Sequence, residues 1–209
     1  MISTEDKIRE IVEAGGEGKV YFPSDFFECG PEKAVSKALQ RLTAKGTLMR
    51  MYRGIYCSPC MDFEWGLGPL PADAKDVAEA VAKRDGVRLT LCFGQAQNAL
   101  GLSTQVVLNP VYSTDGPSRM IPYRKGARPI VFYHVPPKAF QLKNKLVQMT
   151  YIALLDIGKD SLWEFDMDAL EGVYATVPYE DIREDLRILP SWMRTLILQY
   201  YGKDRFMAV

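Results

Sequence analysis

Histidine and cysteine are scarce in this 209-residue chain, which has one histidine and four cysteines. Metal sites and histidine-dependent nucleophilic catalysis need several such residues at set spacings. Cys57 and Cys60 have the spacing of a metal-ligand pair, but Cys29 and Cys92 stand apart from them, and a structural zinc site needs four ligands. We therefore expect no metal and no other cofactor, and we expect His134 to be structural.

Other signals are missing as well. The chain has no glycine-rich phosphate-binding motif and no dinucleotide fingerprint. Its apolar runs are only a few residues long, which argues against a membrane-spanning segment. The first residues are acidic and helical in pattern rather than those of a secretory signal. Together with the few cysteines, these absences predict a cytoplasmic, reduced protein with no membrane partner.

One acidic cluster could have carried chemistry. Glu164, Asp166 and Asp168 lie close together in sequence and could form a metal site for nucleotidyl transfer or hydrolysis. The Gly-Ser turn that commonly precedes such carboxylates is absent, and acidic residues also favour the first turn of a helix. We prefer the helical interpretation and do not expect an enzyme.

The strongest positive pattern lies in residues 31–56. At about 100° per residue, residues 31–45 predict a helix with one apolar side, made by Ala34, Val35, Ala38, Leu39 and Leu42. The opposite side is polar and carries Lys33, Ser36, Lys37, Gln40 and Ala44, flanked by Arg41. Pro31 suits the first turn, where its missing N–H would be unpaired anyway, and Gly46 ends the helix. Two short strands are expected next, over residues 47–51 and 54–56.

Charge is unevenly distributed although the whole chain is neutral. Residues 1–30 contain three basic and seven acidic residues, a net charge of −4. Residues 31–56 contain six basic residues and one acidic residue, a net charge of +5. The cations are Lys33, Lys37, Arg41, Lys45, Arg50 and Arg53. Positive charge is thus concentrated where it could contact phosphate, although a solvated helix face would be the plainer interpretation of the stripe alone.

The order of predicted elements defines two domains. A helix ending near residue 14, with Ile8, Ile11 and Val12 buried, is followed by a strand at 19–22, a short helix at 25–29, the 31–45 helix and the hairpin. This order predicts an N-terminal winged helix-turn-helix over residues 1–58. Residues 59–209 are expected to form a mixed domain with a small antiparallel sheet and a helical C-terminus. The overall class is therefore α+β.

In the second part, residues 58–72 are rich in Pro and Gly and predict a linker or a wrapping loop. A helix over 74–84 follows, and then strands that include 106–108, 111–113, 119–123 and 129–135. From residue 143 onward the pattern is helical. Leu196, Ile197 and their aromatic neighbours make the last helix very apolar, which indicates packed core or, alternatively, a dimer contact.

Three segments resemble the AbiEi-type antitoxin family of bacterial abortive-infection systems. They are SDFFECGPEKAVSKALQRLTAKGTLMRMYRGIYCSP (24–59), GLSTQ (101–105) and YSTDGPSR (112–119). The resemblance covers about residues 1–160. It implies an N-terminal winged helix that represses its own operon and a C-terminal domain required for antitoxicity. It also implies a nucleotidyltransferase-like toxin, encoded nearby, as the partner.

We therefore expect a DNA-binding transcriptional repressor and antitoxin. Its base-reading residues would be Ser36, Lys37, Gln40 and Arg41, because Arg and Gln suit bidentate readout of guanine and adenine. Its phosphate contacts would be Lys33, Lys45, Arg50 and Arg53. The partner would be double-stranded DNA at the protein's own promoter, bound on repeated half-sites through dimerisation or cooperative occupancy. A second basic surface is expected at Arg119, Arg124, Lys125 and Arg128, although a solvated turn would give the same pattern.

Two other functions remain open at this point. The first is a protein-interaction module that neutralises a partner toxin without reading DNA. The second is an enzyme that uses Glu164, Asp166 and Asp168 as a metal site.

Overall fold

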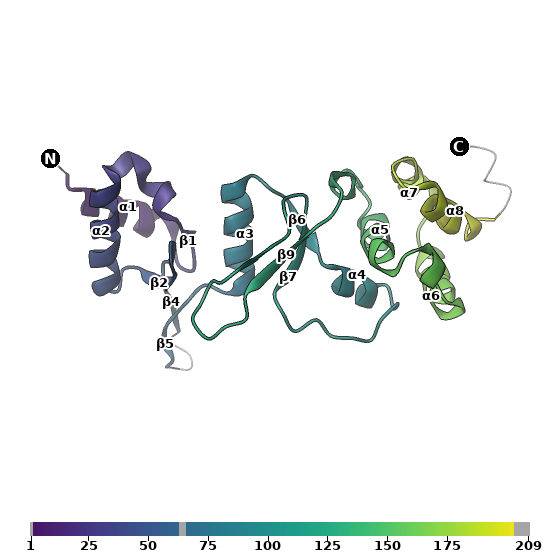
Figure 1. The fold of residues 1–209 in the computed structure, drawn as a ribbon, viewed down its shortest axis with the longest axis horizontal. Coiled ribbons are helices and arrows are strands. Elements are labelled where there is room, and N and C mark those ends of the chain that lie inside the picture. Colours follow the sequence, from purple (N-terminus) through teal and green to yellow (C-terminus); the bar gives the residue numbers. More distant parts are fainter. Residues whose placement is uncertain (1, 63–65, 203–209) are drawn as a thin grey trace. The chain divides into compact units, whose positions relative to one another are not determined.

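The computed structural model describes residues 2–62 and 66–202 of the chain (Figure 1). It has the predicted α+β class, with helices and small sheets along the chain. The chain forms two compact units. The first runs to Gly86 and also includes Met120–Ile130, while the second contains Val87–Arg119 and the residues from Val131 onward.

The first unit begins with a helix, a short strand, a 3-10 helix and a second helix. In chain order, these and the following elements are α1 (Thr4–Gly15), β1 (Val20–Tyr21), η1 (Pro23–Cys29), α2 (Glu32–Ala44), β2 (Met49–Tyr52), β3 (Ile55–Cys57), β4 (Cys60–Asp62), β5 (Gly68–Leu70) and α3 (Ala74–Asp85). The Ser3 hydroxyl caps α1 by accepting from the Asp6 amide, and Asp73 caps α3 in the same way.

The first sheet has the strand order β1–β3–β2, with antiparallel neighbours. Its core lies between α1, α2 and the sheet, and includes Ile8, Val12, Phe26, Leu39 and Leu42. Ile11 was also predicted to be buried, but it is 40% exposed. Ile8 and Val12, four residues apart, share the inner face of α1, and Ile11 lies at its margin.

The predicted linker at 58–72 contains two paired strands, β4 and β5, in which Cys60 pairs with Leu70 and Asp62 with Gly68. The helix α3 packs within the first unit, where the Arg84 guanidinium lies 4.4 Å from the centre of the Phe22 ring. The first compact unit therefore extends beyond the boundary at 58/59 that the sequence suggested. That boundary stays a prediction about functional domains.

A four-stranded sheet and a group of helices follow α3 along the chain. The elements are β6 (Leu89–Leu91), α4 (Phe93–Ala99), β7 (Val111–Thr114), β8 (Arg119–Ile121), β9 (Ile130–His134), η2 (Pro137–Phe140), α5 (Lys145–Ile157), η3 (Lys159–Ser161), α6 (Glu164–Tyr174), α7 (Tyr179–Leu186) and α8 (Ser191–Gln199). All of them lie in the second unit except Met120 and Ile121 of β8 and Ile130 of β9. The strand order is β6–β7–β9–β8, so β9 lies between β7 and β8. The strands β6 and β7 are antiparallel whereas β7 and β9 are parallel, so the sheet is mixed rather than purely antiparallel as predicted. Residues 106–108, a predicted strand, lie in irregular backbone.

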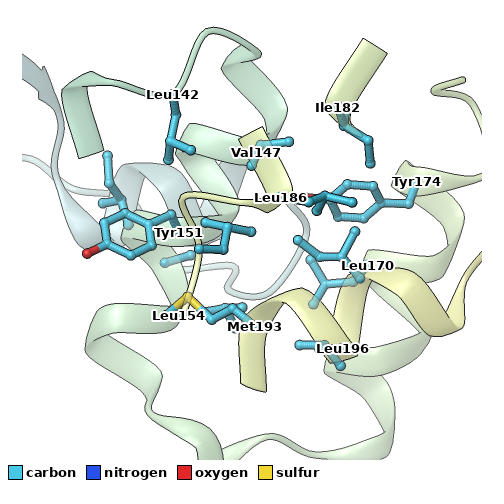
Figure 2. Packing of buried hydrophobic residues seen from close by; sticks show 14 of the residues in the cluster. Leu142, Val147, Tyr151, Leu154, Leu170, Tyr174, Ile182, Leu186, Met193 and Leu196 are labelled. Carbon is cyan, nitrogen blue, oxygen red and sulfur yellow. The ribbon is translucent and has the colours of Figure 1, made fainter. Parts of the chain in front are cut away.

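The helices of the second unit, from α4 to α8, share one hydrophobic core. Figure 2 shows Leu170, Tyr174, Leu186 and Leu196, from α6, α7 and α8, packed beside one another. The apolar α8 is thus core, as one of the two sequence interpretations proposed. The buried Asp185 carboxylate of α7 accepts from the backbone amides of Lys143 (3.1 Å) and Asn144 (2.6 Å), which ties α7 to the start of α5.

Within the described ranges, each helix is too short or too polar to cross a bilayer.

Candidate nucleic-acid interface

The helix α2 divides into the two faces that its periodicity predicts. Val35, Ala38, Leu39 and Leu42 are buried in the core of the first unit. The opposite side is open to solvent, and besides Glu32 and Ala44 at the two ends of the helix it exposes five residues, Lys33, Ser36, Lys37, Gln40 and Arg41. The helix begins at the Pro31 carbonyl, which accepts from the Ala34 and Val35 amides. We call the five exposed residues the polar face of α2.

The strands β2 and β3 form a short hairpin over residues 49–57. Along β2, Met51 points into the core, whereas Arg50 and Tyr52 are exposed, as the period-two alternation of a strand requires. Arg53 is exposed in the turn, which Gly54 completes at φ 73°. All eight residues that the sequence predicted for DNA contact are therefore exposed, including Lys45 at the end of α2. Tyr52, 41% exposed between the two arginines, was not singled out by the sequence.

Two of the predicted cations already have an acidic neighbour. Glu5 of α1 forms ion pairs with Arg41 (3.4 Å between Nη1 and Oε2) and with Lys45. The Glu5 side chain is only 14% exposed, whereas those of Arg41 and Lys45 are 66% and 59% exposed. Within residues 2–62 and 66–202, Lys33, Lys37, Arg50 and Arg53 have no ion pair of this kind. Glu5 is a component of this surface that sequence reasoning missed.

The ion pairs also set the protonation of Glu5. The hydrogen bond from Lys45 holds the pKa of the Glu5 carboxyl below its ordinary value, and Arg41 acts in the same direction. Because the folded-state pKa is lowered, the stabilising effect is present above the unfolded-state pKa and is lost as the pH falls through the lowered value. At neutral pH the carboxylate is charged and attracts both cations.

A groove of about 440 Å³ runs beside the start of α2. Ser36 lies at its edge, and its walls are mainly apolar, with Phe27, Val35, Leu39 and Tyr56 among the lining residues. Phe27 is 74% exposed. Ser36 therefore has a more apolar setting than the cations on the same face of α2.

The four residues predicted to form a second basic surface are divided between the two compact units. Arg124, Lys125 and Arg128 are exposed in the segment between β8 and β9 that belongs to the first unit. Arg119 is half-buried in the second unit, with its guanidinium 5.5 Å from the centre of the Phe132 ring. The structure thus groups three of the four residues as solvent-facing cations and gives Arg119 a packing role.

The alternative chemical sites do not assemble. The Asp166 carboxylate accepts from the Trp163 amide (2.9 Å) at the start of α6, so it serves as a helix cap. Cys57 is buried and Cys60 exposed. In the part of the chain that the structure describes, no three residues of the His, Cys, Asp and Glu types are grouped to hold a metal ion. His134 is fixed by its backbone, since its amide donates to the Ser118 hydroxyl (2.8 Å).

Comparison with known proteins gives one sequence family. The family described as "Family of unknown function (DUF6088)" matches residues 7–182. No curated protein matches the chain.

Among solved structures, the chain resembles the RV2827C protein from Mycobacterium tuberculosis. The two share 14% sequence identity, with a TM-score of 0.43 over 97% of this chain and 78% of that one. A likeness this distant supports no inference about activity.

Proposed function

Because this chain belongs to DUF6088, a family of unknown function, we propose its function from the surface described above: it binds double-stranded DNA through α2 and the 49–57 hairpin. The observation that carries the proposal is the joint exposure of six cations on two consecutive elements whose other faces build one core. Duplex DNA presents one negative charge per about 1.7 Å of its axis, so such a surface is attracted to it regardless of sequence.

The arrangement of elements supports a specific docking mode. The order α1, β1, η1, α2, β2 and β3 is the order of a winged helix-turn-helix, with α2 as recognition helix. The major groove, about 12 Å wide, admits one α-helix. In this mode the residues that approach base edges are Ser36, Lys37, Gln40 and Arg41. The backbone contacts are made by Lys33, Lys45, Arg50 and Arg53.

The resemblance to AbiEi-type antitoxins extends the proposal to a biological role. We propose that the DNA site is the protein's own promoter and that binding represses transcription. One such module buries only about 600–1,000 Å² of protein surface. Two copies on repeated half-sites would provide the remaining affinity. On the basis of the same resemblance, we propose that the C-terminal domain, residues 59–209, neutralises a nucleotidyltransferase-like toxin.

A salt titration tests the proposal. The affinity for a labelled duplex from the protein's own promoter, measured by fluorescence anisotropy, is expected to fall with a slope of log K against log salt of about −5 if six phosphates are neutralised. This corresponds to a loss of about 1,000-fold between roughly 50 and 200 mM salt. A flat salt response without preference for the promoter would contradict DNA binding by this surface.

Glu5 gives a second expected result. Since its carboxylate competes with phosphate for Arg41 and Lys45, the change Glu5→Gln is expected to raise DNA affinity by about tenfold and to make the salt slope steeper by about one. Anisotropy titrations at several salt concentrations measure both quantities.

The matched control is Glu10→Gln, which removes the same charge from an exposed position of the same helix. It is expected to change the affinity by less than about twofold. Equal effects of the two substitutions would mean that only the net charge matters and that the Glu5 ion pairs do not restrain the two cations.

A further inference from the structure

The segment between β8 and β9 joins two strands of the four-stranded sheet, and its residues belong to the first compact unit. We call residues 122–129 the 122–129 loop. It lies within a stretch, residues 116–155, that contains no acidic residue and seven Lys or Arg residues. Three of these cations, Arg124, Lys125 and Arg128, are exposed in the loop itself. This stretch therefore carries a formal net charge of +7.

The backbone of the loop is held in a defined turn. The Ala127 amide donates to the Arg124 carbonyl (3.2 Å), and Gly126 has a φ of 79°, which suits the third position of a type II turn. Tyr123 is 7% exposed and anchors the start of the turn, with the Arg124 guanidinium 5.9 Å from the centre of its ring. Arg124 and Lys125 thus project from an ordered turn, which lowers the entropy that binding would cost.

The loop also begins beside the 49–57 hairpin. Tyr52, Arg53 and Gly54, at the hairpin turn, line a groove of about 480 Å³ together with Ile121 and Pro122, where the loop starts. Three residues of extended chain span at most about 10 Å. The backbone of Lys125 therefore lies within about 10 Å of Pro122, which lines the same groove as the hairpin turn.

We infer that the 122–129 loop is a second DNA-backbone contact, in which Arg124 and Lys125 bind phosphates that flank those contacted by the hairpin. This inference rests on the proposed function and extends it, because it makes the DNA footprint longer than α2 and the hairpin alone would cover. Each added phosphate contact steepens the salt slope by about 0.9. The loop contributes through position and charge, and it reads no base.

The test uses the full chain and the double variant Arg124→Ala/Lys125→Ala. With a duplex of about 40 base pairs from the promoter, the salt slope is expected to become shallower by about two, and the affinity at roughly 100 mM salt to fall by about 60-fold. The matched control, Lys145→Ala/Lys159→Ala, removes two exposed cations of the second unit. It is expected to stay within about twofold of the unmodified protein.

A second pair of substitutions separates this inference from the proposed function. If the loop variant binds like the unmodified protein while charge reversal on α2 abolishes binding, the loop contact is wrong and the proposed function stands. If charge reversal on α2 also leaves binding intact, both are wrong. Arg124→Gln/Lys125→Gln keeps polar side chains of similar length and is expected to give the same loss as the alanine pair. An unchanged unfolding midpoint in both loop variants confirms that the fold is kept.

Discussion

The double substitution Lys37→Glu/Arg41→Glu is expected to reduce the affinity for promoter DNA by more than about 1,000-fold. Both side chains lie on the polar face of α2, away from the core formed by its other side. Each reversal replaces a positive charge beside the duplex by a negative one, so the two reversals together change the charge by four units, comparable with the loss of about four phosphate contacts. Anisotropy or gel-shift titration at constant salt measures the change.

The fold is expected to survive this change, because neither side chain is buried. Arg41→Glu does bring a second carboxylate near Glu5, so the unfolding midpoint should be recorded for the same sample. A matched control reverses two exposed cations of the second unit, Lys145→Glu/Lys159→Glu. Should the α2 variant keep its affinity, the alternative function, a protein-interaction module that does not read DNA, becomes the better account.

Leu170→Ala is expected to lower the free energy of unfolding by about 3–5 kcal/mol. The side chain has no exposed surface and lies among α6, α7 and α8, with Tyr174 and Leu196 close by (Figure 2). Truncation removes apolar contacts and leaves a cavity that these helices can close only in part. Chemical denaturation followed by circular dichroism measures the loss.

The matched control for Leu170→Ala is Leu108→Ala, the same substitution at a position of the second unit where the side chain is 81% exposed. It is expected to change the free energy of unfolding by less than about 0.5 kcal/mol. Equal losses from the two substitutions would contradict the packing of the helical core described here.

Local patterns made much of the fold predictable. The faces of α2 follow from a period that any short window of sequence contains, and the caps Ser3 and Asp73 each act on the amide three residues away. The exposure of Lys37 and Gln40 could be predicted for the same reason. Each of these features depends on residues that are close in the chain.

Features that depend on residues far apart in the chain could not be predicted from the sequence. Glu5 reaches Arg41 and Lys45 across 36 and 40 positions, and no local period relates them. Asp185 accepts from the Lys143 and Asn144 amides across more than 40 positions. A carboxylate in such a role looks, in sequence, like any other acid on a helix.

Strand prediction failed where pairing decided the outcome. Residues 106–108 are apolar but have irregular backbone, whereas β4 and β5 pair in a Pro- and Gly-rich stretch that shows no alternation. Whether three residues form a strand depends on a neighbouring strand that pairs with them, and the rest of the fold decides which strand that is. The same limit applies to the candidate site. The cations at 124–128 can be identified from the sequence, but their membership of the first compact unit cannot.

The discontinuous first unit has a consequence for protein synthesis. At about 5–20 residues per second, a ribosome needs roughly 2–9 s to advance from Gly86 to Ile130, the last residue of that unit. During this interval the nascent chain has α2 and the 49–57 hairpin but not the loop that completes the unit. A fragment that ends at residue 58 or 86 permanently lacks the 122–129 loop. Under the proposed function, its DNA footprint should therefore match that of the nascent chain and not that of the full-length protein.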